Sequence, residues 1–288
     1  IDSPYKLYTT KKGQWSAYQQ LFMGDNGENG ASVEAIFPIL QDGLKTTSYG
    51  TTLYLMAGSN DNSEHIKSAA IAGNSTTGGW AGNRMRPDLV LKFFPNNDAP
   101  NVAAYAMPAA ADDDRALFDG EGRNVSNGDD EKGVKVFTNG FSVCKFNNFK
   151  TDGSAGLNSL FPDADFFLMR AAEAYLMYAE ADARQNNGTT TAQGTAYINA
   201  LRTRANATTQ TAYSLRQICD EWSREFYFEG LRRTTLIRFG YFGGNVNYNW
   251  SWKGGVKSGR NFDSHLNLFP IPTSDMVANS NLIQNTGY

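Results

Sequence analysis

Residues 165–184 read DFFLMRAAEAYLMYAEADAR, and this stretch decides the fold class. Its apolar and small side chains recur three or four residues apart, at Leu168, Ala172, Tyr175, Leu176, Ala179 and Ala183. That spacing puts them on one face of an α-helix, where they can pack against a neighbouring element. Opposite charges three or four residues apart on the same stretch favour the helix further. The pattern therefore predicts an amphipathic helix over 165–184.

Two more helices are expected downstream of this one. The run 186–188, Asn-Asn-Gly, is typical of a helix C-terminus and ends the first helix. A second helix, over about 191–205, would fold back on the first as an antiparallel hairpin of tetratricopeptide size. A third helix is predicted over 214–229, because Ser214 and Gln217 form a capping box at its start.

The rest of the chain has a different texture. Residues 1–162 are rich in Gly, Asn, Asp, Ser and Thr, and their short apolar runs at 35–40 and 51–56 are predicted as strands. We therefore expect a loop-rich candidate binding region over 1–162, a helical hairpin core over 163–240, and an aromatic hairpin with a C-terminal tail over 241–288, all in one compact unit. The expected fold is mainly α, with tetratricopeptide-like helical hairpins in an α–α superhelix, long loop-rich excursions and a few short β-strands.

Composition excludes several classes of function. Lys and Arg number 26 against 29 Asp and Glu, so the net charge is −3, and no basic cluster could neutralise a nucleic-acid backbone. Cys144 and Cys219 lie far apart and belong to no metal-binding spacing, so we expect two buried free thiols. The two histidines, His65 and His265, stand in no recognisable catalytic motif. The sequence indicates no metal, no cofactor and no nucleic-acid partner.

Two glutamates on the third predicted helix leave an enzymatic alternative open. Glu221 and Glu225 are one turn apart and could be offered as the acid/base pair of a glycoside hydrolase. Such pairs flank a cleft and usually come from different elements. Carboxylates on one helix face, interleaved with arginines, more often form a structural ion network. We favour the network.

Aromatic residues gather near the C-terminal end. If the segment is extended, alternation puts Tyr248, Trp250 and Trp252 on one face. Flat rings stack well on the apolar faces of sugars, so this face is a candidate sugar platform, with Trp250 as its ligand-binding residue. The favoured alternative is that the face packs down on the helices.

Four blocks of sequence together resemble one protein family. They are Leu168–Leu176 with Tyr178–Ala181; Ile198–Ala205; Glu221–Glu225 with Phe228–Gly230 and Leu236–Arg238; and Pro270–Pro272 followed by Asn279, Asn281 and Gln284–Tyr288. In order and spacing they resemble the SusD/RagB family of nutrient-binding outer-membrane lipoproteins from Bacteroidetes. The resemblance runs from about Phe37 to Tyr288, with Thr286 in place of a Pro typical of the family.

The resemblance implies a non-catalytic protein of the cell surface. Family members bind oligosaccharides, or in some cases peptides, and cap a SusC-like TonB-dependent transporter in the outer membrane. They are anchored by a lipidated N-terminal Cys that this sequence does not contain, and they are usually much longer. The chain thus resembles the C-terminal portion of an oligosaccharide-binding subunit for starch or another glycan. A peptide-binding member is the alternative within the family, and a glycoside hydrolase is the alternative outside it.

Candidate ligand-binding residues lie mainly in the first third of the chain. Trp80, Asn83 and Arg84 stand in the Gly-rich segment 78–84 and combine a flat ring with hydrogen-bonding groups suited to sugar hydroxyls. The alternative is a loop anchor whose Trp folds into a crevice. In starch-type members of the family, aromatic residues from this part of the chain form an arc that follows a helical glucan, and this resemblance adds Tyr49 and Tyr54.

Charged residues of the family's helical signature are expected to pack between helices as a structural ion network. These residues are Arg170, Glu173, Glu180, Arg224, Glu225 and Arg238.

Overall fold

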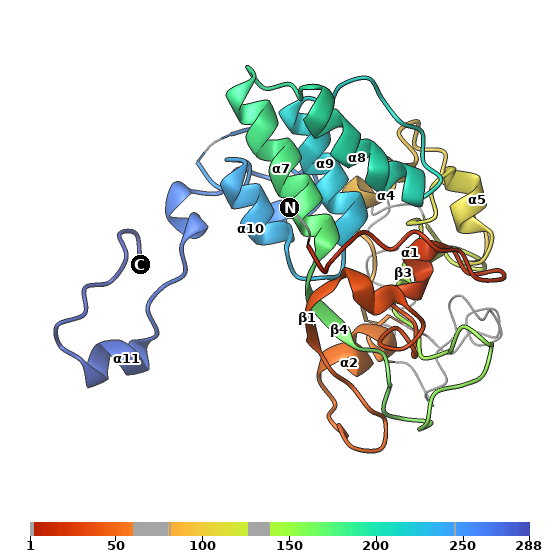
Figure 1. The fold of residues 1–288 in the computed structure, drawn as a ribbon. Helices are drawn as coiled ribbons and strands as arrows, with labels where there is room; N and C mark the ends of the chain where they lie inside the picture. Colours follow the sequence, from red (N-terminus) through yellow and green to blue (C-terminus); the bar gives the residue numbers. More distant parts are fainter. Residues whose placement is uncertain (1–2, 60–79, 81, 126–138, 245) are drawn as a thin grey trace. The chain divides into compact units, whose positions relative to one another are not determined.

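The computed structural model describes residues 3–288 except 60–79, 81, 126–138 and 245 (Figure 1). The chain forms two compact units, Ile1–Glu229 and Gly230–Tyr288. The sequence texture changes at 163 and 241, whereas the division between the units falls at 230. Within the described ranges, no helix has both the length and the apolarity needed to cross a bilayer.

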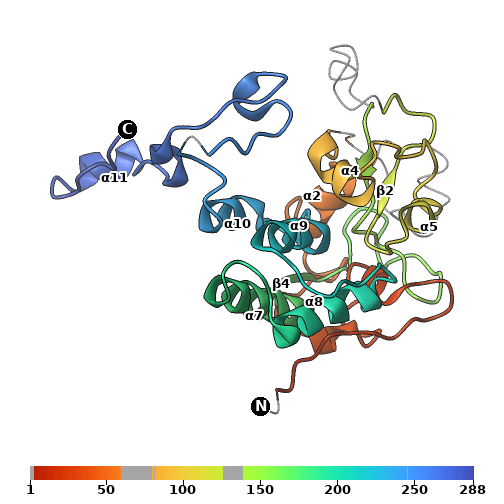
Figure 2. The same cartoon turned by 90° about the horizontal axis from the view of Figure 1, so that it is seen from above.

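Three helices form the helical layer of the first unit. Helix α7, Ala171–Gln185, and helix α8, Ala192–Arg204, make the expected antiparallel hairpin, and α9, Leu215–Phe226, packs against α7. Figures 1 and 2 both show the three helices side by side. Apolar side chains from all three are fully buried between them: Leu176, Ala179, Ala183, Ile198, Leu201 and Ile218. The mainly helical fold is confirmed.

The first helix begins later than its sequence pattern predicts. Strand β4, Phe166–Arg170, precedes α7 and pairs antiparallel with β1, Ala35–Ile39. This pairing across the chain overrides the local helical pattern of 165–170, as tertiary context often does. Arg170 ends the strand in extended backbone and serves as the N-cap of α7. The strand predicted at 35–40 is therefore confirmed as β1, and the helix predicted from 165 begins at 171.

The strand predicted at 51–56 is wrong, because this run forms helix α2, Thr51–Ala57. Leu53, Met56 and Ala57 share one helix face and are buried. The Thr52 hydroxyl donates a hydrogen bond of 2.9 Å to the carbonyl oxygen of Ala164, which fixes the helix against the chain before β4. A short apolar run of this length fits either element, and here the packing decides.

Helix α9 begins with the predicted capping box. The Ser214 hydroxyl accepts from the backbone N–H of Gln217 at 3.3 Å, and the Gln217 side-chain oxygen accepts from the backbone N–H of Ser214 at 2.8 Å. The helix ends at Phe226, three residues before the predicted end, because the backbone becomes extended at Tyr227 and left-handed at Phe228. This departure lets the Tyr227 hydroxyl donate to the carbonyl oxygen of Arg115 at 2.7 Å.

Replacing Ser214 with alanine is expected to lower the free energy of unfolding by about 1 kcal/mol, because the backbone N–H of Gln217 loses its acceptor, the Ser214 hydroxyl. Urea unfolding followed by circular dichroism measures this change. Ser258→Ala, at an exposed loop position, is the matched control and should leave the free energy of unfolding unchanged. Equal stability of the Ser214→Ala chain and the parent would contradict the role given to the cap.

The loop-rich part of the first unit contains two hydrophobic clusters. One joins α1, Ala17–Gln20, and the 3₁₀ turn η1, Ala31–Glu34, to the β1–β4 ribbon. The other contains α4, Pro87–Phe93, and α5, Met107–Ala111, with the short pair β2, Phe118–Asp119, and β3, Ser142–Val143. Phe228, which follows α9, packs against both clusters and so connects them to the end of that helix.

The second unit holds short elements and stacked rings. It contains α10, Arg232–Arg238, the turns η2, Lys253–Gly255, and η3, Ser264–Asn267, and α11, Thr273–Ala278.

The predicted alternation of Tyr248, Trp250 and Trp252 along one extended face is wrong. The backbone turns at Trp252, where φ is +64°, so the extended segment ends before that residue. Tyr248 stacks on Tyr241, with ring centroids 4.7 Å apart.

Candidate functional site

Two exposed aromatic rings meet beside helix α2. Tyr54 projects from the helix and is 52% exposed, and Trp80 is 45% exposed. Their ring centroids are 6.1 Å apart, with planes inclined at 57°. The backbone N–H of Trp80 donates to the carbonyl oxygen of Ala57 at 2.6 Å. The end of α2 therefore fixes the backbone of Trp80, while the indole ring remains open to solvent.

The two polar candidates follow Trp80 along the same segment. The backbone N–H of Asn83 donates to the carbonyl oxygen of Gly58 at 2.6 Å, directly after α2. The Asn83 amide lies so close to Gly58 that a Cβ there would meet its nitrogen at 2.5 Å. Arg84 pairs with Ser142 in an isolated β-bridge. Backbone bonds thus place Trp80 and Asn83 at the end of α2, and Gly78, Gly79 and Ala81 lie outside the described residues.

Tyr49 stands at the other end of α2, two residues before the helix begins. It is 64% exposed, and its ring meets Phe161 edge to face with centroids 5.6 Å apart. Tyr49, Tyr54 and Trp80 are thus exposed rings near the start, the middle and the end of one short helix. We call these three residues with Asn83 and Arg84 the α2 aromatic site.

Trp250 belongs to the second unit and has a different environment. Its half-buried ring stacks on Phe242, meets Phe262 edge-on, and lies 4.6 Å from the ammonium nitrogen of Lys253. These contacts are with residues outside the α-helices, whereas the favoured alternative placed this face on the helices.

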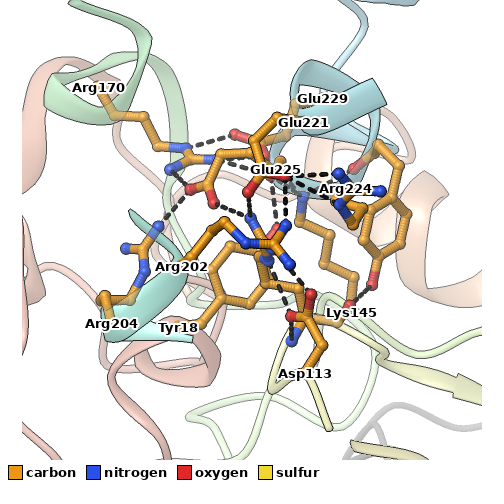
Figure 3. Close-up of polar contacts among 12 residues, drawn as sticks. Tyr18, Asp113, Lys145, Arg170, Arg202, Arg204, Glu221, Arg224, Glu225 and Glu229 are labelled. Carbon is orange, nitrogen blue, oxygen red and sulfur yellow. Dashed lines mark hydrogen bonds and ion pairs between the residues drawn. The ribbon is translucent and has the colours of Figure 1, made fainter. Parts of the chain in front are cut away.

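The interior of the first unit holds a network of ion pairs (Figure 3). We call it the buried ion network, and its members are Glu34, Asp113, Arg115, Lys145, Arg170, Arg202, Arg204, Glu221, Arg224, Glu225 and Glu229. They come from η1, the loops, the N-cap of α7, the end of α8, and α9 with the two turns that follow it. The network therefore links the loop-rich segments to the helices.

Arg170 is one centre of the network. Its guanidinium donates to Glu34 at 2.8 Å, to Glu225 at 2.6 Å and to Glu229 at 2.9 Å. It also lies 3.9 Å from the ring centroid of Phe226. Arg170 is completely buried, so each of its charged contacts is shielded from solvent.

Arg115 is the other centre. It pairs with Asp113 and Glu221, both at 2.7 Å, and with Glu225 at 3.3 Å. Glu221 also pairs with Arg202 at 2.8 Å and Arg224 at 2.7 Å. The acidic run around Asp113 is thus an ion-paired turn.

The predicted network residues divide into those inside and those outside this network. Arg170, Arg224 and Glu225 are inside it. Glu180 pairs with Arg184 on α7 at 2.9 Å, and Glu173 is half-buried in the first turn of α7. Arg238 lies in the second unit over the ring of Phe239.

Sequence reasoning missed the network members contributed from outside the helical hairpin. Glu34, Arg115 and Lys145 lie in loop-rich sequence with no periodic pattern, so nothing local marks them. Arg202 and Arg204, on the hairpin itself, were also missed but could have been found, because two arginines at the end of an otherwise uncharged helix need nearby carboxylates when buried.

The electrostatics of the network exclude Glu221 and Glu225 as a glycosidase pair. Burial raises the pKa of the Glu225 carboxyl, but the guanidinium groups of Arg204, Arg170 and Arg115 outweigh burial and lower this pKa to about 2. Arg115, Arg224 and Arg202 likewise hold the pKa of Glu221 far below its usual range, against burial. A general acid for glycoside cleavage needs a raised pKa and access to substrate. Both carboxyl groups are fully buried and ionised.

Lys145 completes the network beneath the aromatic core. Its ammonium donates to Glu229 at 2.6 Å and to the carbonyl oxygen of Tyr227 at 2.7 Å, and lies 4.4 Å from the ring centroid of Phe22. Burial lowers the pKa of Lys145 to about 8. These contacts hold the chain that follows α9 in place. The Lys145 amine is buried and is not accessible as a nucleophile.

We next consider the residues that could form a metal site or a nucleophilic catalytic site. In the described part of the chain, no three His, Cys, Asp or Glu side chains lie together as metal ligands. Cys144 and Cys219 are buried free thiols, as expected. His265 contacts Asp263 at 2.9 Å on the surface, and His65 lies outside the described residues.

Comparison with known proteins decides the family. The sequence model of the SusD family matches residues 33–288. The chain belongs to the SusD family. The resemblance carried by the four sequence blocks is therefore confirmed.

A curated relative of this SusD-family chain is a starch-binding protein SusD from Bacteroides thetaiotaomicron, with 39% identity over 320 residues. The match covers 100% of this chain and 54% of that protein, so the chain spans about half the length of the curated relative it matches.

Solved structures agree on the fold. Surface glycan-binding protein A from Bacteroides thetaiotaomicron, in complex with laminarihexaose, matches with a TM-score of 0.58 and 19% identity, over 99% of this chain and 56% of that one. A SusD superfamily protein from Parabacteroides distasonis matches with a TM-score of 0.57 and 18% identity, over 99% and 54% of the two chains.

Proposed function

We propose that the protein is a non-catalytic oligosaccharide-binding subunit of a glycan uptake system. The observation that carries this proposal is the α2 aromatic site, where the exposed rings of Tyr54 and Trp80 meet beside Asn83. Membership of the SusD family and the 39% identity to a starch-binding protein support a starch-like α-glucan as the ligand class.

The chemistry of the site suits a sugar. Each pyranose ring has faces rich in C–H groups, which gain contact area on a flat aromatic ring, and a rim of hydroxyls that needs donors and acceptors. Tyr54 and Trp80 offer ring faces, and the Asn83 amide and Arg84 guanidinium offer hydrogen-bonding groups. The backbone hydrogen bond from Trp80 to the end of α2 holds the residue beside Tyr54, so less of the backbone's freedom remains to be lost on binding.

Membership of the SusD family supports a partner and a location, which complete the proposal. The protein would act at the outer surface of the outer membrane, beside a SusC-like TonB-dependent transporter that imports the captured glycan. No bond of the glycan would be made or broken in this step, since the paired glutamates of α9 are locked in the buried ion network.

Calorimetric titration with maltoheptaose, laminarihexaose and a mixed peptide pool tests the proposal. Saturable heat with maltoheptaose, without an increase in reducing ends during the titration, is the expected result. Heat with the peptides and with neither glycan would overturn it.

Replacing Trp80 with alanine should weaken maltoheptaose binding roughly 5- to 150-fold. This corresponds to about 1–3 kcal/mol, by analogy with the stacking of nucleic-acid bases on aromatic side chains. Tyr105→Ala removes another exposed ring, near α5, and is the matched control, with unchanged affinity expected. If the Trp80→Ala chain binds as tightly as the parent, the ligand does not rest on the α2 aromatic site.

A further inference from the structure

The first half of the second unit is cationic. Residues 230–262 contain six lysines and arginines and no aspartate or glutamate. The unit carries two carboxylate side chains, Asp263 and Asp275, and Asp263 already contacts His265 at 2.9 Å. A region with one sign of charge attracts ligands of the opposite sign. This part of the chain therefore favours an anionic ligand.

Lys253 is a buried cation in this stretch, and it has no anionic partner among the described residues. It is 1% exposed, and its ammonium donates to the backbone carbonyl oxygen of Tyr248 at 2.9 Å. The same nitrogen lies 4.6 Å from the ring centroid of Trp250 and 4.9 Å from that of Phe262. Aromatic faces attract a cation but do not neutralise its charge. A buried ammonium in these surroundings favours a negative charge bound nearby.

A second cation, Arg260, lies against the same turn. A Cβ at Gly254, directly after Lys253, would meet the Nε atom of Arg260 at 2.6 Å, so the arginine side chain crosses the turn where a larger residue would stand. Arg260 is exposed, and its guanidinium has no hydrogen bond or ion pair to any residue that the structure describes. Two cations thus share one turn, and neither is neutralised within the described part of the unit.

Two neutral polar groups belong to the same loop, residues 247–261, which we call the cationic loop. The side-chain oxygen of Asn249 and the indole nitrogen of Trp252 are buried atoms without a hydrogen-bond partner in the described ranges, although both residues are only half-buried. Asn249 lies beside Lys253, because a Cβ at Gly259 would meet the Cβ atoms of both, at 2.9 and 3.4 Å. Unsatisfied polar groups are costly to bury, so a ligand that supplies their partners is favoured.

These groups together indicate the chemistry of the ligand. The ammonium and the guanidinium attract a carboxylate. The oxygen of Asn249 is an acceptor, so it disfavours a bare anion and favours a hydroxyl group. The half-buried indole of Trp252 offers a flat surface and an N–H donor. A sugar ring that carries a carboxylate meets all three requirements, whereas an inorganic anion meets only the first.

We propose that the cationic loop binds a carboxylated saccharide, through residues that are not part of the α2 aromatic site. Arg260 contacts the carboxylate, and Lys253 supplies a buried positive charge next to it. Trp252 and Asn249 contact the sugar ring and its hydroxyls. This site goes beyond the proposed function, because a neutral α-glucan has no charge for these cations to bind.

Calorimetric titration of the chain with trigalacturonic acid at neutral pH tests the proposal. The fully methyl-esterified trimer is the matched ligand, since it keeps the sugar rings and lacks the charges. Saturable binding of the acid is expected, with the ester about tenfold weaker or more. Equal affinity for the two trimers, or no binding of the acid, would overturn the proposal.

Replacing Arg260 with glutamine should weaken trigalacturonic acid binding about tenfold or more, because the ligand loses a charged hydrogen-bond donor. Lys253→Met keeps an apolar chain between the rings of Trp250 and Phe262, and its affinity should fall in the same direction. Lys6→Gln, at an exposed position of the first unit, is the matched control and should bind as the parent does. Because Arg260 is exposed, its variant tests the proposal even if Lys253→Met does not fold. Parent-like affinity of Arg260→Gln would contradict the proposal.

Triglutamate distinguishes a saccharide from an acidic peptide of the same net charge. It should bind more weakly than trigalacturonic acid, and tighter binding of the peptide would overturn the assignment to a saccharide. Maltoheptaose binding should be the same for Arg260→Gln and the parent. Failure of trigalacturonic acid to bind would leave the maltoheptaose titration unaffected, so this proposal and the proposed function fail separately.

Discussion

Replacing Arg170 with methionine is expected to lower the free energy of unfolding by about 3–5 kcal/mol, which is the usual cost of removing one partner from a buried ion pair. Methionine preserves much of the side-chain length over Phe226, so the lost charge dominates the effect. Glu34, Glu225 and Glu229 would each lose a charged donor in the interior. The neighbouring arginines and Lys145 cannot replace all of these bonds without moving the backbone.

Urea unfolding at neutral pH measures the effect of Arg170→Met. Arg184→Met is the matched control, because Arg184 pairs with Glu180 at the solvent-exposed end of the same helix, and the change expected there is below about 1 kcal/mol. A loss below 1 kcal/mol for Arg170→Met would mean that the buried ion network contributes little to the stability of the first unit.

Acidification is expected to destabilise the first unit. The loss of stability should begin near pH 4.5, well above the pH at which the buried Glu225 takes up a proton in the folded state. The pKa of Glu225 is lowered from 4.5 to about 2, so an unfolded chain takes up a proton at Glu225 in the pH window where the folded chain does not. The stability that Glu225 contributes is fully present above pH 4.5 and is lost as the pH falls through that value toward 2. It amounts to about 3 kcal/mol in full, with about 2 kcal/mol lost between about pH 5 and pH 3.

Denaturant unfolding at a series of pH values measures this loss, and Glu221 adds to it in the same direction. Glu225→Gln is the informative variant, because it lacks the titrating group. It should start less stable and should lose less stability than the parent between pH 5 and pH 3. Parallel pH profiles for the two chains would show that Glu225 is not linked to folding in this way.

The helical hairpin was predictable from sequence because its signals are local. The spacing of Leu176, Ala179 and Ala183, the Asn-Gly end of α7 and the capping box at Ser214 each lie within a few residues and need no distant partner. The same locality explains the error at 51–56, where a short apolar run fits strand and helix equally well. There the decision comes from the packing of Leu53 and Met56.

The candidate site was predictable only in part. The residue types of Trp80, Asn83 and Tyr54 indicated sugar-binding chemistry, but the attachment of Trp80 and Asn83 to the end of α2 depends on backbone hydrogen bonds to residues more than 20 positions earlier in the sequence. Glu34 and Arg115 reach the buried ion network in the same long-range way. Local sequence patterns do not identify partners that lie far away along the chain.

The central claim is that a glycan rests intact on the rings beside α2, and a crystal structure of the chain with bound maltoheptaose tests it most directly. The account predicts an uncleaved oligosaccharide with one sugar face against the indole of Trp80, at carbon–carbon distances of about 3.5–4.0 Å, and a second sugar near Tyr54. An oligosaccharide bound elsewhere on the chain with Trp80 unoccupied, or a shortened product in the crystal, would contradict it.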